Sequence, residues 1–224
     1  MPGLIFAMEG AEAIAFAAAP TIAFRLRVLN PEAQLSDSAI QNVALRCQIL
    51  IEAQRRKYTP AEREGVSDLF GEPDRWGQTL CPLLWTHAGI TVPAFHDSVV
   101  VEIPVACTFD FNVAAAKYFH AAEVDDVPLV FQFSGTVFFS SADGNMRIAQ
   151  IGWDKESRFR LPAKVWREMM ELYYPNSSWL RLRRDVFDRL HAYKRQQGLA
   201  TCEQALESLL PAVAGNASAR KGAA

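Results

Sequence analysis

The stretch IQNVALRCQILIEA, residues 40–53, decides the fold class, because apolar and polar side chains alternate along most of it. From Val43 to Ala53 every odd position is apolar, and the even positions include Arg46, Gln48 and Glu52. A period of two is typical of a β-strand with one buried face and one wet face, as in an antiparallel sheet covered on one side. We therefore place a long strand of such a sheet here.

Four more segments carry strand patterns. They are IAFRLRVL (22–29), VVVEIPVACTFDF (99–111), VPLVFQFSGTVFF (127–139) and MRIAQIGW (146–153). The sequence SADGN, residues 141–145, contains an Asp-Gly turn and joins the last two segments as a hairpin. Pro104 has no backbone N–H to donate, so we predict that its strand lies at an edge or at a bulge.

Helical patterns come mainly after the strands. Pro162 opens AKVWREMMELYY (163–174), and an extended link, Trp179–Leu182, leads to a second helix between about Asp185 and Gly198. We place four positions on the inner face of this second helix: Val186, Phe187, Leu190, and Tyr193 or Lys194. A short helix capped by Asn112 and a last helix opened by a capping box at Thr201–Gln204 complete the set. The predicted fold class is α+β, an antiparallel β-sheet followed by a C-terminal helix–link–helix packed on it.

The domain organisation that follows is simple. Residues 1–210 form one α+β domain, in which 58–97 is a turn-rich insertion and 161–210 is the helical half. Residues 211–224 are rich in Ala, Gly and Ser and are predicted to be a disordered tail.

Composition excludes several classes of protein. Half of the 224 residues are apolar, 21% are charged and the net charge is −2, as in an ordinary globular domain. The N-terminal segment is alanine-rich, but Glu9 and Glu12 interrupt it and the first basic residue is Arg25, so it does not match a signal peptide. No uninterrupted apolar run is long enough to span a membrane. The four cysteines form no CxxC pair, which favours reduced thiols and a cytoplasmic protein.

Catalytic and metal-binding patterns are not found. The sequence contains no GxSxG, GxxxxGK[ST] or GxGxxG motif. Cys81, His87 and His96 come nearest to a ligand set, but they are widely spaced and lack a fourth partner. We therefore predict no catalytic residue, no cofactor and no metal site.

Charge is distributed unevenly along the chain. Between Ala61 and Val130 there are eleven acidic and three basic residues, whereas eleven basic and six acidic residues lie between Ile151 and Ala200. Oppositely charged faces can attract a partner or a second copy of the chain. The basic stretch 173–198 also contains aromatic residues, which raises nucleic-acid binding as a hypothesis. Phe187 and Leu190 are assigned to a core face, so nucleic acid is the least favoured partner.

The order of elements resembles the SecB-type export chaperones. The residues that carry this likeness are IQNVALRCQILIEAQ (40–54), VPLVFQFSGTVFF (127–139) and the helical half from Leu161 to Gln197, with its Leu161-Pro162, Tyr174-Pro175 and Phe187-Asp188 pairs. Residues from about 58 to 126 have no counterpart in SecB. The whole chain also resembles an uncharacterised bacterial family, on VACTFDFNVAAAKYF, FSGTVFF and YYPNSSWLRLRRDVFDRL. That family tends to be encoded near high-affinity nickel-iron uptake hydrogenases.

Three functional hypotheses remain open. The first is a non-enzymatic chaperone or assembly factor, implied by these resemblances, that binds an apolar segment of a client protein and takes part in hydrogenase maturation. The second is a small-molecule-binding or enzymatic domain with its pocket between sheet and helices, and the third is nucleic-acid binding. For the first hypothesis we predict partner contacts at Trp76, Leu84, Trp85, Phe95, Arg181 and Arg183. The four apolar residues are chosen because large apolar side chains in an insertion mark binding sites. A homo-oligomer is compatible with the complementary charges.

Overall fold

The structure is a computed structural model that describes residues 3–33, 39–108, 114–119, 126–141, 144–177 and 180–210. The chain divides into two compact units, Met1–Ser177 and Ser178–Ala224. The predicted Asn112 cap, the Asp143 turn position, Trp179 and the tail from residue 211 lie outside the described residues.

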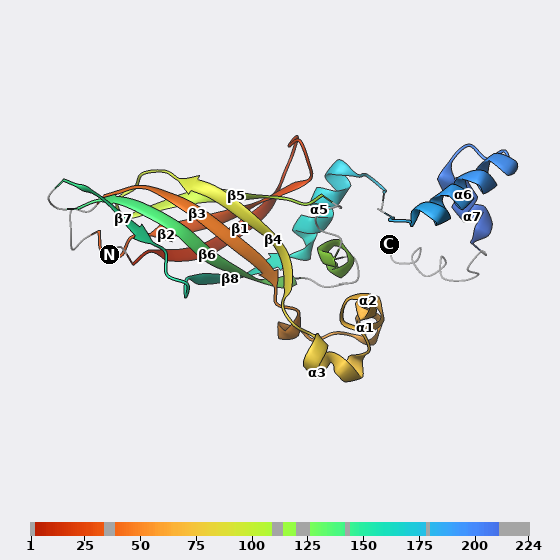
Figure 1. The fold of residues 1–224 in the computed structure, drawn as a ribbon, viewed down its shortest axis with the longest axis horizontal. Coiled ribbons are helices and arrows are strands. Elements are labelled where there is room, and N and C mark those ends of the chain that lie inside the picture. The colour runs from red at the N-terminus through yellow and green to blue at the C-terminus, as the bar shows by residue number, and fades with distance from the viewer. Residues whose placement is uncertain are drawn as a thin grey trace, which may run out of the picture. The chain divides into compact units, whose positions relative to one another are not determined.

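The first unit contains two antiparallel sheets (Figure 1). One has the strand order β1 (Ile5–Ile14), β2 (Thr21–Leu29), β5 (Ser98–Ala106). The other has the order β4 (Leu83–Val92), β3 (Ile40–Ile51), β6 (Asp126–Ser140), β7 (Met146–Gln150). A further strand, β8 (Glu156–Pro162), pairs with the first half of β6, on the side where β7 pairs with its second half. The predicted α+β class is confirmed.

The two sheets pack face to face, and the apolar faces of their strands form the core. Along β3 the residues Val43, Leu45, Cys47, Ile49 and Ile51 are buried, as the alternation predicted. Phe6 of β1 stacks on Phe133 of β6 at 4.5 Å, and Phe24 of β2 meets Phe131 of β6 edge-on at 5.1 Å. The layer that covers each sheet is therefore mainly the other sheet.

The chain crosses between the sheets at β2–β3, at β4–β5 and between β5 and β6, and the two sheets also meet along β1 and β8. The link between β2 and β3 is tied to the link between β4 and β5, because Asn30 N donates to Asp97 O at 2.8 Å. Met8 N of β1 donates to Ser157 Oγ of β8 at 3.1 Å. On the other flank β5 lies against β4. Pro104 lies in β5, an edge strand of its sheet, as predicted.

Gly135 lies at a close approach of β3 and β6. Its φ of +142° lies in a region that side-chain-bearing residues avoid, and a Cβ atom there would lie 2.0 Å from the carbonyl oxygen of Ala44. Only glycine fits this position, which fixes the pairing of Gly135 with Leu45.

The insertion predicted at 58–97 contains more regular structure than its sequence suggests. It contains α1 (Pro60–Gly65), α2 (Ser67–Phe70), the 3-10 turn η2 (Pro73–Arg75) and α3 (Trp76–Thr79), followed by β4, and a further 3-10 turn, η1 (Ala53–Arg55), precedes it. The strand was missed because a register shift opposite Ile49/Leu50 breaks its alternation and turns both Trp85 and Thr86 inward.

Helix α5 (Ala163–Tyr173) packs on the first unit, at one end of the sheets (Figure 1). Its Trp166 and Met169 are buried, and Tyr173 Oη donates to Ile14 O at 2.8 Å and accepts from Ala17 N at 2.7 Å. These bonds hold the turn between β1 and β2. The described helices include none long and apolar enough to cross a membrane.

The second unit contains α6 (Arg184–Gln196) and α7 (Cys202–Leu209), joined by a short turn. The predicted capping box is present, since Thr201 accepts from Gln204 N and the Gln204 side chain accepts from Thr201 N. Leu190 and Ala205 are buried, whereas Phe187 is 47% exposed. The assignment of Phe187 to the inner face was wrong, because the buried face of α6 is narrow: it contains Leu190 but not Phe187.

Candidate protein-binding edge of the five-stranded sheet

Trp85, one of the predicted partner-binding residues, lies in the core. It is only 4% exposed, and its ring meets those of Phe24, Phe119 and Trp166 edge-on at 5.9, 5.2 and 6.2 Å. In this conformation its side chain supports the packing of β4 and α5 and presents no surface to a partner.

The other predicted apolar residues differ in exposure. Trp76 is half-buried against the ring of Tyr58 at 5.1 Å, and its Nε1 donates to Gly71 O at 2.9 Å. Phe95 is also half-buried and forms an isolated bridge with Ile40. Leu84 is 46% exposed on the outer face of β4. Leu84 is therefore the most exposed of these residues in fractional terms.

Arg181 and Arg183 belong to the second unit, and both are exposed. Arg183 forms an ion pair with Asp185 at 3.3 Å. An exposed pair of this kind contributes little to stability, so Arg183 remains available for partner contact.

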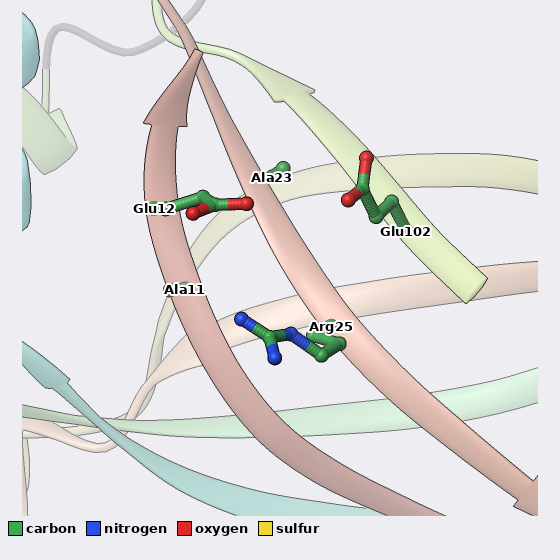
Figure 2. Close-up of a pocket in the computed structure, with 5 residues that line it drawn as sticks. All are labelled: Ala11, Glu12, Ala23, Arg25 and Glu102. Carbon is green, nitrogen blue, oxygen red and sulfur yellow. The ribbon is translucent and has the colours of Figure 1, made fainter. Parts of the chain in front are cut away.

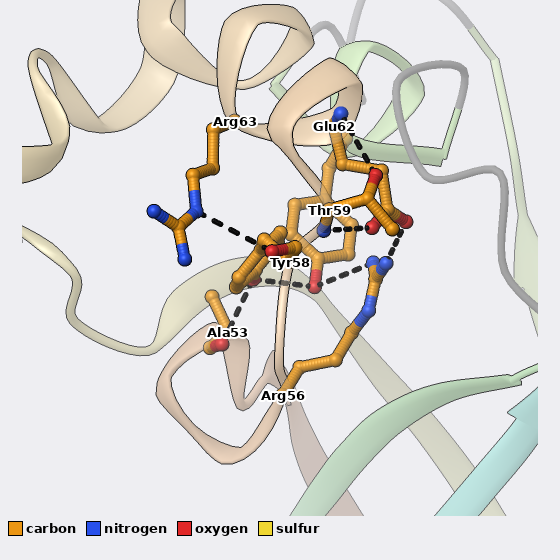
Figure 3. Close-up of polar contacts among 7 residues, drawn as sticks. Ala53, Arg56, Tyr58, Thr59, Glu62 and Arg63 are labelled. Atoms are coloured by element: carbon orange, nitrogen blue, oxygen red, sulfur yellow. Dashed lines mark hydrogen bonds and ion pairs between the residues drawn. The ribbon is translucent and has the colours of Figure 1, made fainter.

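A buried polar cluster anchors the helical part of the insertion (Figure 3). Arg56, whose side chain is 7% exposed, forms an ion pair with Glu62, and its guanidinium lies 4.7 Å from the centre of the Tyr58 ring. Tyr58 donates to Ala53 O at 2.8 Å, so Tyr118 is the donor in the 2.9 Å bond between the two tyrosines. The cluster connects η1, α1 and the helical residues 114–119 to one another. Its role is therefore structural, and we call it the structural lock.

Two groups of this lock have shifted pKa values. Burial by itself would raise the pKa of Glu62, but the N–H of Thr59 and the guanidinium of Arg56 outweigh it and lower that pKa below its ordinary value. Burial raises the pKa of Tyr58. The carboxylate is thus held charged and the phenol neutral.

Two hollows lie on the outer faces of the sheets. The first, which has essentially no enclosed volume, is lined by Ala11, Glu12, Ala23, Arg25 and Glu102 (Figure 2). Small-molecule pockets usually enclose about 300–1,000 Å³. The second is an open depression of about 280 Å³ over β3 and β4, lined by Ala44, Leu45, Arg46, Gly89, Ile90 and Thr91. Neither lies between sheet and helices, where the second hypothesis places a ligand.

Cys81, His87 and His96, the nearest approach to a ligand set in the sequence, are not brought together as one among the described residues. Among the described residues there is no group of three or more His, Cys, Asp and Glu side chains that could hold a metal ion. Cys81, His87 and His96 are each exposed on the surface.

The free edge of β7 is the feature best suited to binding. Bonds from Ile151 N to Gly135 O and from Ser141 N to Asn145 O, both 2.9 Å, set the phase of the β6–β7 ladder. In an antiparallel pair only alternate residues bond to the neighbouring strand. The N–H and C=O groups of Met146, Ile148 and Gln150 therefore point away from β6, and β7 pairs with no other described strand.

Large apolar side chains accompany these outward-pointing backbone groups, which pair with no described strand. Met146 is 69% exposed and Ile148 63% exposed, both on the outer face of the sheet. Phe138, half-buried on β6, lies directly beside Ile148. Trp153, in the turn after β7, is 96% exposed. We call the backbone and side chains of Met146, Ile148 and Gln150 the β7 edge.

Sequence reasoning recognised the strand in this region but missed its exposure. Ile148 and Ala149 are adjacent and both apolar, so composition does not show which of them faces the core; Ala149 is the buried one. The signal that could have helped is length, since β7 has only five residues and edge strands are often very short.

Comparisons with known proteins show the family and little else. The chain belongs to the family of unknown function DUF6084, whose sequence model matches residues 1–218. A comparison with curated proteins finds no match. The solved structures that it resembles include a Northeast Structural Genomics Consortium target, SoR45, at 10% identity and a TM-score of 0.27, covering 81% of this chain and 94% of that one. The solution structure of a candidate late embryogenesis abundant (LEA) protein, At2g46140.1, matches at 11% identity and 0.26, covering 72% and 73%.

Proposed function

We propose that this member of the DUF6084 family is a non-enzymatic accessory protein that binds an extended apolar segment of a client protein. The client segment adds to the five-stranded sheet as a strand beside β7. The observation that carries the proposal is the β7 edge, where free backbone groups and exposed apolar side chains coincide. Strand addition uses both, since the backbone supplies affinity and the alternate side chains supply selectivity.

The size of the edge sets the expected affinity. Three residues that each offer an N–H and a C=O group allow up to six hydrogen bonds, each contributing about 0.5–1.5 kcal/mol net. Apolar contact with Met146 and Ile148 adds to this sum, while the ordering of a flexible client subtracts from it. We therefore expect dissociation constants of about 1–100 µM.

Binding of a probe peptide tests the proposal. The probe is a fluorescein-labelled peptide of alternating valine and threonine with a lysine at each end, and the readout is fluorescence anisotropy. Ile148→Pro removes an N–H that points away from β6, and proline is tolerated on an edge strand. We expect this variant to remain folded and to bind the probe at least tenfold more weakly.

Leu84→Lys is the matched control. Leu84 is also an exposed apolar residue on the outer face of the same sheet, but it lies on β4, in the predicted insertion. We expect Leu84→Lys to bind the probe like the wild type. Unchanged binding by Ile148→Pro together with weak binding by Leu84→Lys would move the client site to the insertion and refute the proposal for β7.

A nickel-iron hydrogenase subunit is the client to test first. The likeness to a family encoded near uptake hydrogenases supports this choice, and the likeness of the helical half to SecB supports a role in holding unfolded segments. The tagged chain and its Ile148→Pro variant would each be mixed with the purified hydrogenase large subunit in its unassembled form. Retention by the wild type alone is expected, whereas equal retention by both would contradict strand addition.

A further inference from the structure

We infer that the β7 edge also pairs with the β7 edge of a second copy of the chain, so that a symmetric dimer covers the client site when no client is bound. The inference rests on the proposed function, because it names what occupies the same edge in the free protein. Exposed edge strands are normally protected from unwanted pairing, and β7 has no covering strand or helix among the described residues.

The backbone of β7 is complementary to itself. The outward-pointing residues are the first, third and fifth of its five, Met146, Ile148 and Gln150. If two β7 strands run antiparallel about a two-fold axis at Ile148, the two Ile148 residues exchange N–H···O=C bonds, and each Met146 does the same with the partner's Gln150. Every outward donor then meets an outward acceptor. A two-fold interface of this kind is the commonest form of homo-oligomer.

The side chains agree with this register. Residues directly opposite in antiparallel strands point to the same face, so Ile148 contacts its own copy and Met146 contacts the partner's Gln150. None of these three is charged, and the apolar surface of Ile148 is removed from water. The joined sheet has the order β4-β3-β6-β7 followed by the same strands reversed, which is within the size that open sheets commonly reach.

The interface is small, which makes the dimer reversible. Five residues from each chain bury less than the roughly 1,200 Å² of a stable specific interface. The dimer should therefore form at high concentration and dissociate on dilution. Because dimer and client use the same backbone groups, a client that binds the monomer shifts the equilibrium toward monomers.

Two double variants test the register by sedimentation equilibrium over chain concentrations from about 1 µM to about 1 mM, a range chosen for a weak interface. In Met146→Lys/Gln150→Lys, each new lysine lies opposite a lysine of the partner, and we expect a monomer throughout. In Met146→Lys/Gln150→Glu, each lysine lies opposite a glutamate, and we expect the mass to rise toward twice 24.9 kDa, as in the wild type. Both variants remove the same two side chains.

Binding of the probe peptide is also measured at about 1 µM chain, a concentration at which we expect an interface this small to be dissociated. The two measurements together then distinguish the dimer from the proposed client binding. A wild type that stays monomeric at all concentrations overturns the inference, and probe binding in that case leaves the proposed function intact. Equal masses for the two double variants overturn the register. A wild type that dimerises but does not bind the probe supports the inference and contradicts the proposed function.

Discussion

The substitution Glu62→Gln tests how the helical insertion is held, because it removes the negative charge from a buried ion pair and changes little else. The Glu62 and Arg56 side chains are 3% and 7% exposed, and Glu62 also accepts from Thr59 N at 2.8 Å. A glutamine can keep the bond to Thr59 but leaves the guanidinium of Arg56 buried without a counter-charge.

The cost follows from that burial. Removing one partner of a buried ion pair costs about 3–5 kcal/mol, whereas an exposed pair contributes about 0.3–0.5 kcal/mol. The matched control is Glu168→Gln, since Glu168 pairs with Lys164 at 3.3 Å and the two side chains are 54% and 77% exposed. Urea unfolding followed by tryptophan fluorescence would measure both free energies of unfolding.

The pH dependence of this pair has a definite sign. The pKa of Glu62 is lower in the folded chain than in the unfolded one, so its contribution is fully present above the unfolded value. It is lost as the pH falls through the folded pKa, where Glu62 becomes protonated. We expect the difference in stability between wild type and Glu62→Gln to shrink in that acidic range. A difference below about 1 kcal/mol at neutral pH would refute the description of Arg56 and Glu62 as a buried lock.

Three further predictions concern the core of the sandwich. Gly135→Ala should destabilise the chain by more than about 2 kcal/mol in thermal unfolding, because a Cβ would lie 2.0 Å from a backbone oxygen, whereas Gly89→Ala, whose nearest neighbour is at 3.7 Å, should cost under about 1 kcal/mol. Trp85→Ala should lower the free energy of unfolding by about 3–5 kcal/mol, and a near-neutral effect would contradict the burial of Trp85. Cys47, whose pKa burial raises to about 12, should react with a thiol reagent only on unfolding, while the exposed Cys81 reacts at once; a fast reaction of Cys47 in the native chain would contradict its burial.

Local patterns predicted the elements that obey a single rule. The alternation in β3 is regular because both neighbours of that strand are antiparallel and one face lies in the core. The capping box at Thr201 depends only on residues within one turn, and it forms as predicted. Such features depend on short-range chemistry, so the chain itself specifies them.

Tertiary context decided the features that were missed. The β1 strand is rich in Ala and Gly, and it forms because β2 and α5 provide its partners. The bulge in β4 sends Trp85 inward, which no regular period could show. The exposure of Ile148 depends on β7 having a neighbour on one side only, and strand order is a property of the assembled sheet.

Hydrogen–deuterium exchange at β7 tests the central claim most directly. At about 1 µM chain the amides of Met146, Ile148 and Gln150 should exchange rapidly, because they have no acceptor among the described residues, while those of Arg147 and Ala149 in the ladder with β6 are protected. Saturating probe peptide should slow exchange at the three outward amides by at least tenfold and leave Arg147 and Ala149 unchanged. If the bound peptide leaves all three outward amides exchanging at their free rates, the client does not add as a strand beside β7.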